Sequence, residues 1–168
     1  MNKLVLIGFM GSGKSSVAPL VAKALEYRAI EMDEEILRTA GFTDIPATFR
    51  ALGESGFREL EAQVARSLRD ACAVVISTGG GVVGRPSNIA DLRHGGGATV
   101  FLDTSFPVIH DRIKDLHSRP LFQDLEQARV LFEERLPLYR RYADMTVKTD
   151  DKNPLQVCDA ILAQLRYV

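Results

Sequence analysis

Short runs of apolar residues alternate along this chain with longer stretches in which apolar residues recur every three or four positions. A continuous apolar run is typical of a strand covered on both faces, whereas the wider spacing is typical of a helix with one buried face. The runs predict strands at residues 3–7, 28–32, 73–77, 98–102 and 144–148. The spaced stretches predict helices at 15–25, 34–39, 46–52, 57–71, 124–142 and 154–165.

Strands that alternate with helices indicate an α/β fold, with a parallel sheet and helices on both of its faces. The chain has 168 residues, and no internal repeat or linker-like segment interrupts the alternation. We therefore expect one domain over residues 1–168. Pro19 conflicts with its surroundings, because a proline inside the first predicted helix removes one backbone hydrogen bond.

Composition and charge exclude several classes of protein. Hydrophobic residues make up 46% and charged residues 26% of the chain, which is ordinary for a soluble domain. The formal net charge is −1, whereas proteins that bind duplexes usually carry a basic excess, so we expect no nucleic-acid partner. The longest apolar runs are far shorter than the ~20 residues that span a bilayer. We expect no membrane partner and a cytoplasmic location.

The two cysteines, Cys72 and Cys158, lie far apart, and no histidine is near either of them in sequence. This spacing favours two buried free thiols over a zinc site or a redox pair.

Residues 8–15, Gly-Phe-Met-Gly-Ser-Gly-Lys-Ser, match the phosphate-binding pattern G-x-x-x-x-G-K-[ST] at every fixed position. The match lies between a predicted strand and a predicted helix, as that loop requires. Its backbone N–H groups and the helix N-terminus together favour a polyphosphate. Lys14 is placed to reach the β- and γ-phosphates, and the Ser15 hydroxyl can bind Mg²⁺. The chain has no Asn-Lys-x-Asp sequence for guanine and no room for a motor domain, which favours a small-molecule kinase.

Such an enzyme also needs a carboxylate for its metal ion, and the pattern leaves two candidates open. Asp103 ends the predicted strand at 98–102, although an Asp there can equally cap a following helix. Glu31 and Asp33 follow the strand at 28–32, and a spacing of two in an extended chain places both side chains on one side.

Two further segments suit ligand binding. Gly79, Gly80 and Gly81 directly follow the buried strand at 73–77, where open α/β sheets bind their ligands. Arg119 lies in a stretch that interrupts two helical patterns, and a basic loop there suits an enzyme that closes over phosphates.

The ordered set of these motifs resembles the shikimate kinase family of nucleoside-monophosphate-kinase-like P-loop proteins. The matching pieces, which run along nearly the whole chain, are residues 11–16, Asp33, Gly53-Glu54, Phe57-Arg58, Glu61, 79–81, Arg119-Pro120-Leu121, 135–139 and Ala143-Asp144. The resemblance implies a three-layer α/β/α fold with a five-stranded parallel sheet in the order 2-3-1-4-5. It also implies a substrate-binding helical segment at about 34–61 and a lid at about 112–124.

The resemblance further implies transfer of the ATP γ-phosphoryl group to the 3-hydroxyl of shikimate, in aromatic amino-acid (chorismate) biosynthesis, with Mg²⁺ and as a monomer. The ATP-binding residues that it implies are Gly11, Ser12, Gly13, Lys14, Ser15, Ser16, Arg112, Arg119, Lys152 and Pro154. Its shikimate-binding residues are Asp33, Arg58, Glu61, Gly79, Gly80, Gly81 and Arg135. Its catalytic residues are Asp33, Lys14 and Arg119, and its metal-binding residues are Ser15 and Glu31.

In this assignment Asp33 is the base, Arg58 and Arg135 clamp the shikimate carboxylate, and Glu61 holds Arg58. The side chains suit these roles, because Arg pairs with carboxylates and a hydroxyl nucleophile needs an acceptor for its proton. The family usually has Asp-Thr-Asp or Asp-Ser-Asp where this chain has Glu31-Met32-Asp33, and Lys152 stands where an Arg is common. The alternatives are a related kinase such as a gluconate kinase, or a nucleotide-binding relative without activity.

Overall fold

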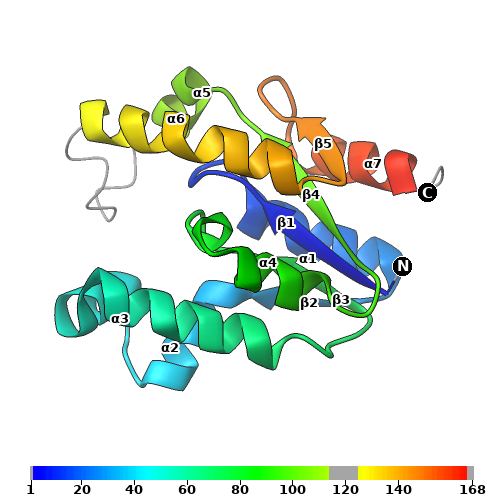
Figure 1. The fold of residues 1–168 in the computed structure, drawn as a ribbon. Helices are drawn as coiled ribbons and strands as arrows, with labels where there is room; N and C mark the ends of the chain where they lie inside the picture. Colours follow the sequence, from blue (N-terminus) through cyan, green and yellow to red (C-terminus); the bar gives the residue numbers. More distant parts are fainter. Residues whose placement is uncertain (1, 114–124, 166–168) are drawn as a thin grey trace.

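The computed structural model describes residues 2–113 and 125–165, and Figure 1 shows how the elements are arranged. Five strands form one sheet in the order β2-β3-β1-β4-β5, and every neighbouring pair is parallel. The strands are β1 (Lys3–Ile7), β2 (Arg28–Glu31), β3 (Val74–Ser77), β4 (Gly97–Asp103) and β5 (Met145–Lys148). The expected α/β class and strand order are confirmed.

Seven helices connect and cover the strands in the described part of the chain. They are α1 (Lys14–Leu25), α2 (Met32–Ala40), α3 (Ile45–Ser67), α4 (Pro86–Arg93), α5 (Phe106–Ile113), α6 (Leu125–Tyr142) and α7 (Pro154–Leu165), and a 3₁₀ turn, η1 (Val82–Gly84), precedes α4. Helices α1 and α7 lie on one face of the sheet, and α3, α4 and α6 lie on the other (Figure 1).

Successive side chains of β1 enter two different cores, because neighbouring residues of a strand point to opposite faces. Leu4 and Leu6 pack with α1 and α7, whereas Val5 and Ile7 pack with the helices of the other face. Every residue of this strand is buried, as expected for the central strand of a sheet covered on both sides.

Lys3 is also buried, at the start of the same strand. Its Nζ donates to the carbonyl oxygens of Leu68, at 3.0 Å, and Arg69, at 2.6 Å, at the end of α3. A buried ammonium group needs such acceptors, because burial otherwise disfavours its charge and lowers the pKa of Lys3. The lysine therefore joins the central strand to the end of the longest helix.

Helix α3 merges the two helices predicted at 46–52 and 57–71. It begins after Asp44, whose side chain accepts a hydrogen bond from Ala47 N at 2.7 Å, as an N-cap does. It bends at Gly53, which has φ 67° and ψ 177°. Only glycine adopts this conformation readily, so the bend is fixed by the sequence.

The other differences from the predicted elements have local causes. Helices α4 and α5 were not predicted, since each has only eight residues, too few to show a clear helical period. Pro19 is accommodated inside α1. Cys158 is buried as expected, but the expectation for Cys72 was wrong: this thiol is exposed in the connection before β3.

Because all five strands are parallel, their carboxyl ends lie at one edge of the sheet. The segments that leave this edge are 8–13, the β2–α2 junction, 78–81, and the loops after β4 and β5. The start of β1 and the end of α7 lie at the opposite edge, on the same side of the molecule (Figure 1).

Candidate active site

The loop between β1 and α1 surrounds the ammonium group of Lys14. This side chain is only 7% exposed, and Nζ donates to the Gly8 and Phe9 carbonyls at 2.7 and 2.9 Å and to Ser12 Oγ at 3.3 Å. Gly13 precedes the helix with φ 97°, a left-handed conformation that favours glycine. The loop thus holds a buried cation at the N-terminus of a helix, an arrangement that suits an anionic phosphate.

Glu31 lies beside this loop, at the end of β2. Burial raises the pKa of its carboxyl group, whereas a hydrogen bond with Ser15 and the charge of Lys14 lower it. The backbone carbonyl of Asp103, the other candidate for a metal ligand, accepts a hydrogen bond from Thr149 N at 3.0 Å. The contacts of the phosphate-binding loop therefore favour Glu31 over Asp103.

Ser77 pairs with Glu31 in the register of β2 and β3. Its hydroxyl is 1% exposed and makes no hydrogen bond of ordinary geometry within the described residues, but it lies near enough to the Glu31 carboxyl group to lower the pKa of that group. A buried polar group without a partner is rare, and a water molecule or a hydrated ion commonly satisfies it. In residues 2–113 and 125–165 no three His, Cys, Asp or Glu side chains are grouped to hold a metal. The few oxygen atoms of Ser15, Glu31 and Ser77 fit Mg²⁺, which keeps several waters and takes few protein ligands.

The glycine loop after β3 lies where the predicted acceptor-binding residues converge. A Cβ atom on Gly79 would lie 3.2 Å from Asp33 Oδ1 and 3.5 Å from Glu61 Oε1. One on Gly81 would lie 2.3 Å from Arg58 Nη1, so the guanidinium group occupies the space that a larger residue would fill. The absence of side chains thus lets α2 and α3 approach this backbone.

Gly80 connects the loop to α6 and to the phosphate-binding loop. A Cβ there would lie 3.5 Å from Arg135 Nη1 and 3.4 Å from Met10 N. The guanidinium carbon of Arg135 also lies 5.9 Å from the centre of the Phe9 ring. The structure therefore brings the two predicted binding regions next to each other at the carboxyl edge of the sheet.

Arg58 and Glu61 form a partly buried ion pair one turn apart on α3. Nη1 of Arg58 lies 3.0 Å from both carboxylate oxygens of Glu61, which is 2% exposed. Burial raises the pKa of Glu61, and Arg58 opposes this shift. The pair holds one end of the guanidinium group against Glu61, because Nη1 contacts both carboxylate oxygens.

Arg135 carries a positive charge with incomplete compensation. Burial lowers its pKa, Tyr139 raises it, and repulsion from Arg58 lowers it again. Two guanidinium groups that repel each other beside bare backbone favour an anion between them. Asp33, which raises the pKa of both Glu31 and Glu61, lies close to this anion site and to the phosphate-binding loop.

Two further basic residues, Arg112 and Lys152, lie on the other side of the phosphate-binding loop. Arg112, near the end of α5, donates to Thr149 O at 2.9 Å and to Gly11 O at 3.3 Å. Lys152 follows in the same connection and pairs with Asp151 at 2.9 Å, and Pro154 begins α7. Arg119 lies outside the described residues.

Sequence reasoning missed two polar groups of the site, Tyr139 and Ser77. The Tyr139 hydroxyl donates to Gly80 O at 2.6 Å. Its signal was the spacing of four from Arg135, which places both side chains on one helix face. Ser77 could have been found as the polar end of an apolar, buried strand.

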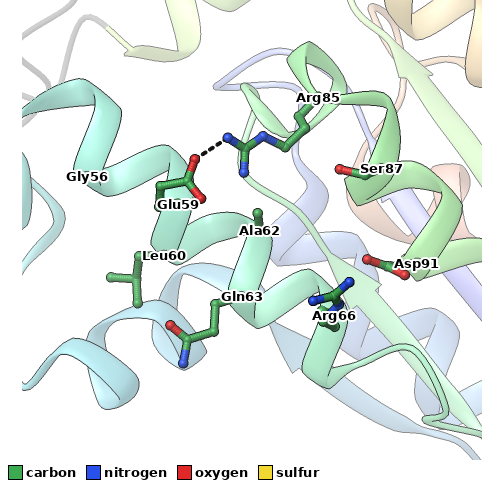
Figure 2. Close-up of a pocket in the computed structure, with 9 residues that line it drawn as sticks. All are labelled: Gly56, Glu59, Leu60, Ala62, Gln63, Arg66, Arg85, Ser87 and Asp91. Atoms are coloured by element: carbon green, nitrogen blue, oxygen red, sulfur yellow. Dashed lines mark hydrogen bonds and ion pairs between the residues drawn. The ribbon is translucent and has the colours of Figure 1, made fainter.

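A separate groove of about 550 Å³ lies between α3 and α4 (Figure 2). It contains none of the predicted site residues. Three of its four charged side chains form ion pairs: Arg85 with Glu59, and Asp91 with Arg69 at 3.2 Å. The groove is therefore distinct from the convergence of residues at the sheet edge.

Known proteins share the sequence and the fold of this chain. The family model described as shikimate kinase matches residues 10–166. The shikimate kinase of Pseudomonas syringae pv. tomato is 42% identical, over 98% of this chain and 96% of its own, and that of Persephonella marina is 35% identical, over 99% and 100%.

Solved structures give the same result. Shikimate kinase from Acinetobacter baumannii in complex with shikimate has a TM-score of 0.92 and 32% identity, and covers 99% of this chain and 94% of its own. The Aquifex aeolicus shikimate kinase has a TM-score of 0.85 and 39% identity, over 98% and 96%. A gluconokinase from Sinorhizobium meliloti, at 24% identity and a TM-score of 0.62 over 99% and 95%, shares the fold alone. On the family match and the identities over nearly its whole length, this chain belongs to the shikimate kinase family.

Proposed function

We propose that this protein transfers the γ-phosphoryl group of ATP to the 3-hydroxyl of shikimate, a step of aromatic amino-acid (chorismate) biosynthesis. The observation that carries the proposal is the convergence of Arg58 and Arg135 on the glycine loop, with Asp33 beside them. A small acid with a carboxylate and neighbouring hydroxyls fits this set of groups. Membership of the shikimate kinase family supports the same acceptor.

The nucleotide is held by residues 11–16. Their backbone N–H groups and Lys14 bind the phosphates, and Lys14 opposes the charge that spreads over the transferred group. Arg112, Lys152 and Pro154 flank the adenine, which suits their position beside the phosphate-binding loop. Arg119 adds a positive charge from a lid at about 112–124.

Mg²⁺ is the metal ion that suits the donors present. The Ser15 hydroxyl and the Glu31 carboxylate would hold it, and the Ser77 hydroxyl lies beside Glu31 as a further polar group. When bound, the ion neutralises charge on the phosphate oxygens. Glu31 is one methylene longer than aspartate, and contact with the ion through water would accommodate that length.

The acceptor binds in the segment at about 34–61, the glycine loop and α6. Its carboxylate pairs with Arg58 and Arg135, and Glu61 keeps Arg58 directed at the site. Asp33 accepts the proton of the reacting hydroxyl, which makes the oxygen a better nucleophile as the phosphoryl group transfers. The Gly79, Gly80 and Gly81 backbone lies against the ring.

A coupled ADP-release assay with shikimate, quinate, gluconate and no acceptor tests this function. We expect turnover that depends on shikimate and is much weaker with the other two acids. Preference for gluconate or quinate would show that the acceptor is wrong. Turnover without an acceptor, or none at all, would indicate a nucleotide-binding relative without kinase activity.

The residues that the structure describes include no helix both long and apolar enough to cross a membrane. We propose that the protein is a single domain that acts as a monomer in the cytoplasm, without a nucleic-acid partner. The near-neutral charge supports the last point. Light scattering on the protein as it elutes from a size-exclusion column tests the monomer, for which we expect a mass of 18.5 kDa.

A further inference from the structure

The three consecutive glycines of the binding loop are restrained through their carbonyl groups. Gly79 O accepts from Val82 N at 3.2 Å, and Gly81 O accepts from Gly84 N at 3.0 Å. Both of these bonds are local turns. The middle carbonyl, Gly80 O, instead accepts from the Tyr139 hydroxyl at 2.6 Å, from a helix distant in sequence.

Glycine needs such restraint more than any other residue, because it lacks the Cβ that limits backbone rotation. The Gly80 carbonyl and the Gly81 N–H belong to one planar trans peptide, so they point in opposite directions. Fixing the carbonyl therefore fixes the N–H as well. Without the tyrosine, neither of the two turn bonds would prevent this peptide from rotating.

Tyr139 is itself held rigidly. Its side chain is 0% exposed, and its ring stacks on Phe101 with the ring centres 5.3 Å apart and an angle of 20° between planes. Burial raises the pKa of its hydroxyl, so the group remains protonated and can donate at neutral pH. A buried aromatic with one polar atom is a precise anchor for a flexible backbone.

The same hydroxyl lies beside Arg135, one of the two arginines proposed to bind the acceptor carboxylate. Tyr139 follows Arg135 by four residues, which is about one helical turn. A Cβ on Gly80 would lie 3.4 Å from the Tyr139 hydroxyl oxygen and 3.5 Å from Arg135 Nη1. One turn of α6 therefore presents both the Tyr139 hydroxyl and the Arg135 guanidinium group to the bare backbone at Gly80.

We infer that Tyr139 is a positioning residue for acceptor binding: its hydroxyl fixes the Gly80–Gly81 peptide and keeps it in register with Arg135. The inference rests on the proposed function, since the acceptor is taken to be shikimate. Tyr139 acts on the acceptor through the peptide and Arg135.

Tyr139→Phe tests the inference, because phenylalanine keeps the ring stack and removes only the hydroxyl, which donates to Gly80 O and also hydrogen-bonds with Arg135. We expect kcat/KM for shikimate to fall about tenfold, because the Gly80–Gly81 peptide and Arg135 lose the contact that positions them for the acid. KM for ATP should change less than about twofold, and the thermal midpoint only slightly. Tyr142→Phe is the matched control, since it removes a hydroxyl from the same helix outside the site.

An unchanged kcat/KM for shikimate in Tyr139→Phe would overturn the inference. Equal losses toward shikimate and ATP, together with a lower thermal midpoint, would also overturn it, because a general loosening of the fold has that effect. Failure of the proposed function is distinguishable, since the unmodified protein would then not phosphorylate shikimate at all.

Discussion

At Gly81 a hydrogen atom occupies the position where any other residue carries carbon. We predict that Gly81→Ala raises KM for shikimate about tenfold, because the new Cβ would lie 2.3 Å from Arg58 Nη1 and displace the guanidinium group. The colliding atoms are the far end of a flexible side chain, so the thermal midpoint should barely change. Gly84→Ala is the control, because no heavy atom lies within 4 Å of its Cβ position. Equal KM values in the two variants would contradict the prediction.

Asp33 lies close to the glycine loop, since a Cβ atom on Gly79 would lie 3.2 Å from its Oδ1. We predict that Asp33→Asn lowers kcat by a factor on the order of 10² or more, since asparagine keeps the shape and cannot accept the proton. Steady-state kinetics with both substrates provide the measurement, and both KM values should change little. A kcat equal to that of the unmodified protein would remove Asp33 from the role of base.

The buried Glu61 predicts a pH effect on stability. Burial raises its pKa above the ordinary value of 4.5, so between 4.5 and the raised pKa the folded state binds more protons than the unfolded state. The free energy of unfolding contributed by Glu61 therefore falls as pH rises through that window. In urea titrations, the free energy of unfolding of the unmodified protein should fall relative to that of Glu61→Gln as pH rises from 4.5. Glu133→Gln, an exposed change on α6, should show no such trend.

The site was predictable from sequence to an uneven degree. Lys14 and Ser15 follow from a short pattern whose spacing fixes the backbone that they need. Arg58 and Arg135 are far apart along the chain, so only the family resemblance suggested that they meet. Tyr139 and Ser77 act through contacts across the fold, and a tyrosine on a helix or a serine at the end of a strand has no distinctive local pattern.

Among the elements, α3 depends most on a single residue. We predict that Gly53→Ala lowers the free energy of unfolding by about 1–3 kcal/mol, because φ 67° with ψ 177° is accessible to little but glycine. Chemical denaturation measures this loss. Ser55→Ala, an exposed change in the same helix, should leave stability nearly unchanged. Equal stabilities of the two variants would show that the bend does not require glycine.

Sequence patterns predicted strands better than short helices. The central strand β1 matched its predicted bounds, because a buried strand in a parallel sheet is a continuous apolar run. Helices α4 and α5 each have eight residues, too few for a clear period of 3.6. The bend in α3 explains why its two halves looked like separate helices.

Across the whole molecule, Lys3 joins the sheet to the end of the acceptor-binding helix. We predict that Lys3→Met lowers the free energy of unfolding by about 1–3 kcal/mol, because the carbonyls of Leu68 and Arg69 lose their donor. The kcat and KM values should remain close to those of the unmodified protein, since this contact lies at the opposite edge from the site. Lys23→Met, an exposed change on α1, provides the control for urea denaturation. Equal stabilities of the two variants would show that the contact contributes little.

The order of the strands in the sheet could not be predicted from the periodicity of apolar residues. Alternating strands and helices predict a parallel sheet, but the order β2-β3-β1-β4-β5 depends on which crossovers pass over which neighbours. The resemblance supplied that order. The exposure of Cys72 likewise depends on how the connection before β3 lies on the surface, which composition does not determine.

The start of β1 and the end of α7 lie on the same side of the molecule, away from the carboxyl ends of the strands where the reaction takes place. A fluorescent protein or an affinity tag joined beyond Lys3 or Leu165 would therefore extend away from both substrates. The molecule can be immobilised on a sensor chip from that side, with the entrance for nucleotide and acid facing the flowing solution.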